Sequence, residues 1–168
     1  MSNKLSYNCN MCNKKKIIAV ASLGGHWIQL LRIAKPLERR YDVTYMSTHV
    51  KCRTMVDGRK FYSISDFNRR NAWKMFAAVF KCLLVLLLVR PSAVVTTGAA
   101  PGLLVLIMAR LFGAKTIWID SVANVRTLSA CGHLARYFVK HVYTQWPDLA
   151  NDNVDYVGNI FGDHKEGE

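Results

Sequence analysis

The chain has 168 residues, of which 51% are hydrophobic and 11% aromatic, and its formal net charge is +12. This composition excludes general disorder and is sufficient for one sizeable core, so we expect a single folded domain. The charge is uneven, because residues 1–90 hold 17 Lys and Arg against 4 acidic residues, whereas residues 91–168 hold 6 against 7. We therefore expect an anionic surface to face the N-terminal half.

The first segment, residues 1–15, is polar and basic, and we expect a flexible tail there. It shows no secretory signal, which favours a cytoplasmic location. Five scattered cysteines indicate reduced thiols rather than a disulfide framework. Cys9 and Cys12 have the spacing of a metal or redox pair, but no second pair follows to complete four ligands. We expect no metal site, with a zinc site as the alternative.

A glycine-rich turn follows the first predicted strand, at residues 16–21. The strand is an apolar, β-branched run, and an amphipathic segment follows the turn at 28–34. Gly24 and Gly25 remove Cβ atoms from the turn, so the oxygens of a ligand would approach backbone N–H groups and the positive end of the helix. His26 adds a titratable base, which suggests group transfer. The alternative is a glycine-rich corner with a solvated histidine.

The next elements follow from the same patterns. We expect a helix from His26 to Arg40 that Pro36 kinks or divides, and a second strand at 42–46. Residues 47–60 are predicted as a loop or short helix, and residues 61–64 as an edge strand.

Residues 72–89 form an apolar run that only Lys74 and Lys81 interrupt. We favour a helix on the cytoplasmic leaflet of an anionic membrane, with Trp73, Phe76 and Phe80 at the acyl boundary and the two lysines near lipid phosphates. One alternative is an ordinary buried helix of an α/β protein. The other is a transmembrane span, which would have to hide two ammonium groups.

The second half repeats the strand-turn-helix pattern. Strands are expected at 93–97, 115–119, 141–144 and 155–157, helices at 103–112 and 128–140, a corner at 145–147, and a mobile tail over 161–168. The central strand at 93–97 is followed by another small-residue turn that contains Gly98. These elements predict an α/β fold, a Rossmann-like parallel sheet with helices on both faces over residues 16–160. In such sheets ligands bind at the carboxyl ends of the strands.

A polar loop follows the strand at 115–119. Asp120, Ser121, Asn124 and Arg126 supply a carboxylate, a hydroxyl, an amide and a guanidinium, a set suited to sugar hydroxyls and a phosphate. Ordinary loop solubility is the alternative explanation. The sequence has no P-loop, GxGxxG, GxSxG or HExxH motif, which counts against an ATPase, a dinucleotide oxidoreductase, an α/β-hydrolase and a zinc protease.

Four motifs in consistent order resemble one known family over residues 16–160. They are Gly24-Gly25-His26, Thr96-Thr97-Gly98 with Pro101 and Gly102, the segment from Asp120 to Arg126, and Gln145-Trp146-Pro147-Asp148-Leu149. The family is the asparagine-linked-glycosylation subunit fourteen family, which includes bacterial capsule and exopolysaccharide glycosyltransferase subunits. The chain is also similar to the N-terminal half of the N-acetylglucosaminyltransferase that makes lipid II.

This resemblance implies the acceptor and membrane half of a GT-B glycosyltransferase, inactive alone and without a cofactor of its own. The nucleotide-sugar donor would bind to a partner subunit of the GT-B C-terminal-half type, and the acceptor would be a polyprenyl-diphosphate-linked saccharide at the cytoplasmic face. The length agrees, because a second domain of comparable size does not fit into 168 residues.

The resemblance also implies roles for single residues. His26 would be the general base, with Asp120 as a less secure catalytic candidate. The acceptor-binding residues would be Gly24, Gly25, Thr97, Gly98, Ser121, Asn124 and Arg126. The chain departs from the family pattern, since Asp120 stands where the family often has Glu and Asn124 where it often has Arg.

Two other functions remain open. A non-catalytic membrane scaffold would recruit and activate the donor-binding subunit without contributing a base. A nucleic-acid-binding domain is suggested by the net charge alone, but the charge accompanies an apolar helix rather than an aromatic stacking platform. We therefore expect no nucleic-acid partner.

Overall fold

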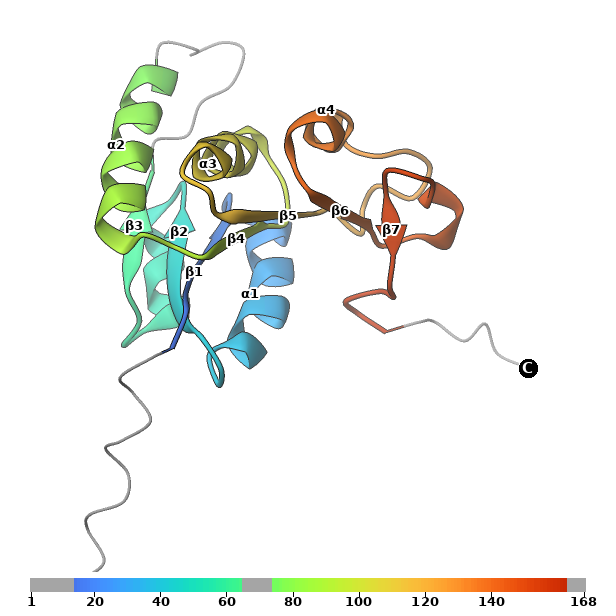
Figure 1. Ribbon diagram of the computed structural model, residues 1–168. Helices are drawn as coiled ribbons and strands as arrows, with labels where there is room; N and C mark the ends of the chain where they lie inside the picture. The colour runs from blue at the N-terminus through green and yellow to red at the C-terminus, as the bar shows by residue number, and fades with distance from the viewer. Residues whose placement is uncertain (1–13, 65–73, 163–168) are drawn as a thin grey trace, which may run out of the picture.

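The computed structural model describes residues 14–64 and 74–162 (Figure 1). The described residues form a seven-stranded sheet in the order β3-β2-β1-β4-β5-β6-β7, in which all neighbouring strands are parallel. The strands are β1 (Lys16–Ala21), β2 (Asp42–Ser47), β3 (Phe61–Ser63), β4 (Ala93–Thr96), β5 (Lys115–Ile119), β6 (His141–Thr144) and β7 (Asp155–Tyr156). The helices are α1 (Gly25–Leu37), α2 (Lys74–Val89), α3 (Ala100–Leu111) and α4 (Ala130–Phe138), with short 3-10 helices η1 (Val50–Val56) and η2 (Pro147–Leu149).

Helices cover both faces of the sheet, which confirms the predicted Rossmann-like fold. Figure 1 shows α2, α3 and α4 on one face and α1 on the other. The alternation of side chains along β1 explains this: Ile18 and Val20 pack with the α2, α3 and α4 side, whereas Ile17 and Ala19 pack with α1 and η1. Two apolar clusters, one on each face, therefore hold the sheet.

The strand order reverses between β1 and β4, which are neighbours in the middle of the sheet. The chain after β1 enters α1 on one face, and the chain after β4 enters α3 on the other (Figure 1). Such a reversal is where ligands bind in open parallel sheets, because the two turns diverge there. The turn with His26 and the turn with Gly98 both lie at this point.

The strands agree with the sequence predictions to within about one residue, but the predicted boundaries of three helices were wrong. α1 ends at Leu37 rather than Arg40, with Pro36 in its last turn. Pro36 has no N–H to continue the helical pattern, and the following residues bond three positions back. α3 begins at Ala100 rather than Leu103, since the first turn of a helix accepts Pro101. α4 spans 130–138 instead of 128–140.

α2 presents one face to the core and the other to solvent. Its buried residues are Ala78, Cys82, Val85, Leu86 and Val89. Phe76 and Phe80 are 75% and 63% exposed, and the Nζ atom of Lys81 lies 3.3 Å from the Ser63 hydroxyl. Neither the buried-helix nor the surface-helix interpretation is therefore complete alone. Trp73 lies outside the described residues.

Three findings bear on the remaining expectations. Within residues 14–64 and 74–162, no helix is both long and apolar enough to cross a membrane. In the same ranges no group of His, Cys, Asp and Glu is arranged to hold a metal ion. Cys52, Cys82 and Cys131 are free thiols, and burial raises the pKa of Cys82 to about 12. Cys9 and Cys12 lie outside the described residues, as does most of each predicted tail.

Candidate functional site

The site begins at the turn between β1 and α1. Gly24 adopts a φ of 101° and a ψ of −144°, which a side chain would disfavour. Its carbonyl accepts hydrogen bonds from the N–H groups of Trp27 and Ile28, and so starts α1. The first N–H groups of a helix have no partner within it. Gly25 and His26 therefore place backbone donors at the carboxyl edge of the sheet, as predicted.

A pair of hydrogen bonds with Thr97 holds His26 in place. Its Nδ1 atom lies 2.7 Å from the carbonyl oxygen of Thr97, and the Thr97 hydroxyl donates to the carbonyl oxygen of His26 at 2.6 Å. A carbonyl oxygen only accepts, so Nδ1 carries the hydrogen and, in the neutral ring, Nε2 keeps its lone pair. This clamp joins the β1–α1 turn to the β4–α3 turn, and it was not foreseen from the sequence.

The turn after β4 lies directly against the histidine ring. A Cβ atom at Gly98 would lie 2.5 Å from Cε1 and 2.7 Å from Nδ1 of His26, so only glycine fits. The next residue, Ala99, has a φ of 69° and a ψ of 157°, a conformation otherwise almost confined to glycine. Gly98 and Ala99 thus place strained backbone beside the imidazole.

The side chain of Gln29 ties α1 to the loop after β5. Its Nε2 atom donates to the Ser121 hydroxyl at 3.1 Å, and both residues are buried. The Ser121 oxygen also accepts from the backbone N–H of Ala123 at 3.3 Å. Gln29 was not predicted as a site residue. Its signal was a polar side chain between apolar neighbours, one helical turn after His26.

Asp120 is 1% exposed and lies at the centre of a hydrogen-bond network. Oδ1 accepts from the indole N–H of Trp118 at 3.1 Å and from the Ser129 hydroxyl at 2.6 Å. Oδ2 accepts from the Asn124 amide at 3.1 Å and from the backbone N–H of Ser129 at 2.9 Å. Burial, and then the charge of Asp120, raise the pKa of the nearby Cys131 thiol.

The remaining predicted residues lie in three places. Arg126 is exposed in the same loop, and residues 123–127 line a shallow cavity of about 370 Å³. Thr97 is fully buried, and its hydroxyl donates its hydrogen to the carbonyl oxygen of His26, so this side chain holds the turn together and exposes no surface to a ligand. Lys74, Phe76, Phe80 and Lys81 lie on α2, on the opposite face of the sheet from α1 (Figure 1).

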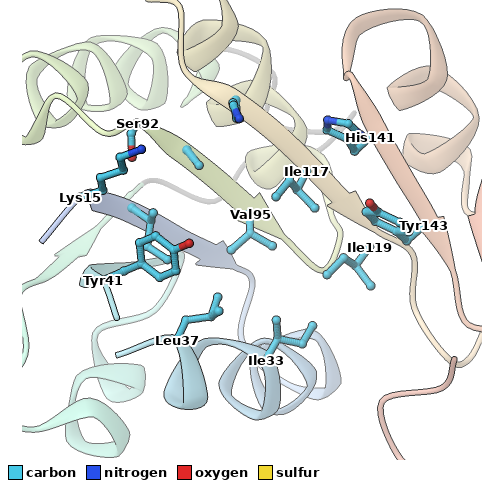
Figure 2. A pocket seen from close by; sticks show the side chains of 13 residues that line it. Lys15, Ile33, Leu37, Tyr41, Ser92, Val95, Ile117, Ile119, His141 and Tyr143 are labelled. Atoms are coloured by element: carbon cyan, nitrogen blue, oxygen red, sulfur yellow. The ribbon is translucent and has the colours of Figure 1, made fainter. Parts of the chain in front are cut away.

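A larger groove of about 440 Å³ lies elsewhere, on the sheet face beside α1. Figure 2 shows Ile33 and Leu37 of α1 facing Val95, Ile117 and Ile119 of the sheet. None of the predicted acceptor or catalytic residues lines it. The groove is therefore separate from the site around His26.

Comparisons with solved structures support the same fold. MurG from Acinetobacter baumannii is similar with a TM-score of 0.69 and 20% identity, covering 86% of this chain and 45% of that chain. The UDP-N-acetylglucosamine 2-epimerase from Rickettsia bellii has a TM-score of 0.70 and 11% identity, covering 89% and 46%. A glycosyltransferase from Rickettsia africae has a TM-score of 0.60 and 14% identity, covering 87% and 43%.

The chain thus spans less than half the length of these solved structures. They include an epimerase as well as a glycosyltransferase, so their fold does not by itself select a reaction. A comparison with curated proteins finds no match.

A match to a sequence-family model identifies the family of this chain more specifically than the solved structures do. The model described as "Oligosaccharide biosynthesis protein Alg14 like" matches residues 51–160, more than half of the chain. The matched range includes the Asp120 loop and the turn after β4, but not the turn with His26. The chain therefore belongs to the Alg14-like family of oligosaccharide biosynthesis proteins.

Proposed function

We propose that this chain is the acceptor-binding, membrane-associated subunit of a two-chain glycosyltransferase. A partner subunit binds the nucleotide-sugar, and the sugar is transferred to a polyprenyl-diphosphate-linked saccharide at the cytoplasmic face. The observation that carries the proposal is the His26 clamp at the reversal of the strand order. It leaves Nε2 as a proton acceptor beside the backbone donors of a glycine turn.

The chemistry assigned to His26 is general-base catalysis. The acceptor hydroxyl oxygen bonds to the anomeric carbon while its proton passes to Nε2, and the bond from that carbon to the nucleotide diphosphate breaks with its electron pair. A single displacement of this kind inverts the anomeric centre. The leaving diphosphate needs donors or cations, which we assign mainly to the partner.

The acceptor diphosphate is assigned to the turn at Gly24 and Gly25. A Cβ atom added at either position would have no neighbouring atom within 4 Å, so the backbone is open to approach. Both residues are exposed. Backbone N–H groups at the start of a helix favour an anion through direct hydrogen bonds and through the helix dipole.

The membrane contact is assigned to the outer face of α2. Phe76, Phe80 and three exposed leucines lie within about one third of the helix circumference. Lys74 and Lys81 follow at one edge of that arc. An apolar face bordered by cations suits the interface of an anionic leaflet.

The test measures sugar transfer to a lipid-linked acceptor by the complex co-purified from membranes. We expect His26→Ala to lower kcat by about a hundredfold or more, because a positioned base contributes that much. His141→Ala is the matched control, since His141 is the first residue of β6 and lies at the amino ends of the strands, whereas His26 follows the carboxyl end of β1. Full activity of His26→Ala would remove the catalytic role.

The same assay separates the scaffold alternative. A scaffold predicts that substitutions at His26 leave turnover intact, whereas substitutions on the exposed face of α2 abolish it. The wide exposed face of α2 is the observation that supports the scaffold alternative. Failure to co-purify any donor-binding subunit would contradict both.

A further inference from the structure

The geometry points to Asp120 as a positioning residue, which holds the acceptor loop through Asn124 and Ser129 and takes no proton from the substrate. This inference rests on the proposed function, because the loop after β5 (residues 121–128) carries Ser121, Asn124 and Arg126, three of the residues expected to bind the acceptor. It distinguishes between the two candidate catalytic residues, the carboxylate of Asp120 and the imidazole of His26, and it leaves His26 as the general base.

The first argument is accessibility. A general base must come within hydrogen-bond distance of the hydroxyl proton it accepts. Asp120 is 1% exposed, and each of its two oxygens already accepts two hydrogen bonds. A substrate hydroxyl would have to displace one of these four donors. His26 is partly exposed and keeps a free ring nitrogen.

The second argument is where the four donors come from. Trp118 belongs to β5, Asn124 to the middle of the loop, and Ser129 to the start of α4. One carboxylate therefore joins the beginning, middle and end of the segment that connects β5 to α4. Hydrogen bonds to an ionised group are the stronger ones, which suits a group that fixes a loop.

Ser129 carries the connection into α4. Its hydroxyl donates to Asp120 and accepts from the backbone N–H of Gly132 at 2.9 Å, so the residue that caps the helix is itself held by the carboxylate. A Cβ atom at Gly132 would lie 2.8 Å from Asp120 Oδ1. The first turn of α4 thus packs directly on the carboxylate.

The loop has a second anchor at its start. Ser121 bonds to Gln29 of α1, one helical turn after His26. With Asp120 holding Asn124 and Ser129, the exposed Arg126 lies between two fixed points. The positioning of Asn124 and Arg126 relative to His26 therefore depends on Asp120 on one side and on Gln29 on the other.

The test compares Asp120→Asn, Ser129→Ala and Ser129→Thr in the co-purified complex. An asparagine has the same shape, but its NH₂ group would face two donors. Ser129→Ala removes a donor and leaves Asp120 in place. We expect Asp120→Asn and Ser129→Ala each to raise the KM for lipid-linked acceptor by about tenfold, which corresponds to the loss of one hydrogen bond to a charged group. We expect kcat to fall less than about threefold.

The pH profile of kcat distinguishes a positioning role for Asp120 from a catalytic one. A positioning role keeps the pH dependence of kcat in all three variants, because the base is unchanged. Ser129→Thr keeps the hydroxyl, so its KM is expected to stay close to that of the wild type. A large loss of kcat with a changed pH profile in Asp120→Asn alone would overturn the inference, as would unchanged kinetics in both Asp120→Asn and Ser129→Ala.

A measurement on the isolated chain separates this inference from the proposed function. We expect Asp120→Asn and Ser129→Ala to speed hydrogen exchange at the Ser129 and Gly132 amides by at least about tenfold, with α1 unchanged. Should Asp120→Asn fail to fold, Ser129→Ala carries the test. An inactive wild-type complex would contradict the function alone, whereas unchanged exchange would contradict the positioning role alone.

Discussion

At the scale of single residues, the site depends on backbone geometry as much as on side chains. Ala99 has a glycine-like conformation, φ 69° and ψ 157°, beside a glycine that the His26 ring requires. Such a conformation costs a residue with a Cβ atom on the order of 1–3 kcal/mol. Strain of this kind clusters at functional sites, and here it lies in the turn that supplies the carbonyl bonded to His26.

We therefore predict that Ala99→Gly stabilises the protein. The relief of strain exceeds the entropy that glycine adds to the unfolded chain, so we expect a gain of about 1 kcal/mol, or about 3 °C in Tm. Thermal unfolding of the purified chain measures it. Ala130→Gly, at the exposed first residue of α4, is the control and should destabilise slightly. A loss of stability in Ala99→Gly would contradict the strain.

The sequence was sufficient to place His26 on the turn between the first strand and the first helix, because a strand, two glycines and a helix follow one another there. It did not predict which ring nitrogen is free. That depends on Thr97, 71 positions away, and on the register of β1 against β4. The network of Asp120 was missed for a related reason, since a motif gives the order of polar residues but not their directions.

At the scale of elements, two glycines near helix starts have different purposes. A Cβ atom at Gly102 in α3 would collide with the Thr96 hydroxyl, which donates to the carbonyl of Val20 at 2.7 Å. Gly25 in α1 has nothing within 4 Å of such an atom. Gly102 therefore brings α3 close to β4, whereas Gly25 leaves open space at the start of α1.

This difference predicts opposite results for the same substitution. Gly102→Ala should cost about 1–3 kcal/mol through overpacking. Gly25→Ala should be neutral or slightly stabilising, because alanine favours a helix. Chemical denaturation of both variants measures the difference. Gly25→Ala should instead weaken acceptor binding by the complex, and equal stability losses in the two variants would contradict the assignment.

Strands were predicted within about one residue, because apolar β-branched runs between glycine and polar turns are specific to buried parallel strands. Helix ends were less accurate. Pro36 and Pro101 each interrupt an apolar pattern, but one lies in a last turn and the other in a first turn. Propensity alone does not distinguish these places, since each depends on which hydrogen bonds the rest of the helix makes.

At the scale of the whole molecule, the proposed site and the proposed membrane contact belong to different sides of one sheet. α2 packs against the core through Cys82 and Leu86, and the side chains on its other face are exposed to solvent. The strands point their carboxyl ends toward the start of α2, because α2 runs back to the beginning of β4. A lipid surface at α2 would therefore lie near the edge that carries His26.

We predict that the double substitution Phe76→Ser and Phe80→Ser weakens binding to vesicles that contain phosphatidylglycerol. Each phenyl group contributes about 1.5–3 kcal/mol on leaving water, so binding should fall at least about tenfold in a co-sedimentation assay. Val157→Ser, an exposed aliphatic residue after β7, is the control and should bind as the wild type does. Unchanged binding of the double variant would exclude α2 as the contact.

The clamp between His26 and Thr97 also bears on the order of folding. It closes a loop of 71 residues, and loop closure costs entropy that must be met by other contacts first. β1 and β4 supply those contacts by pairing in register. The ring nitrogen that accepts the proton is thus defined only after the middle of the sheet has assembled. A fragment that lacks β4 would carry the histidine without the hydrogen bond that selects its tautomer.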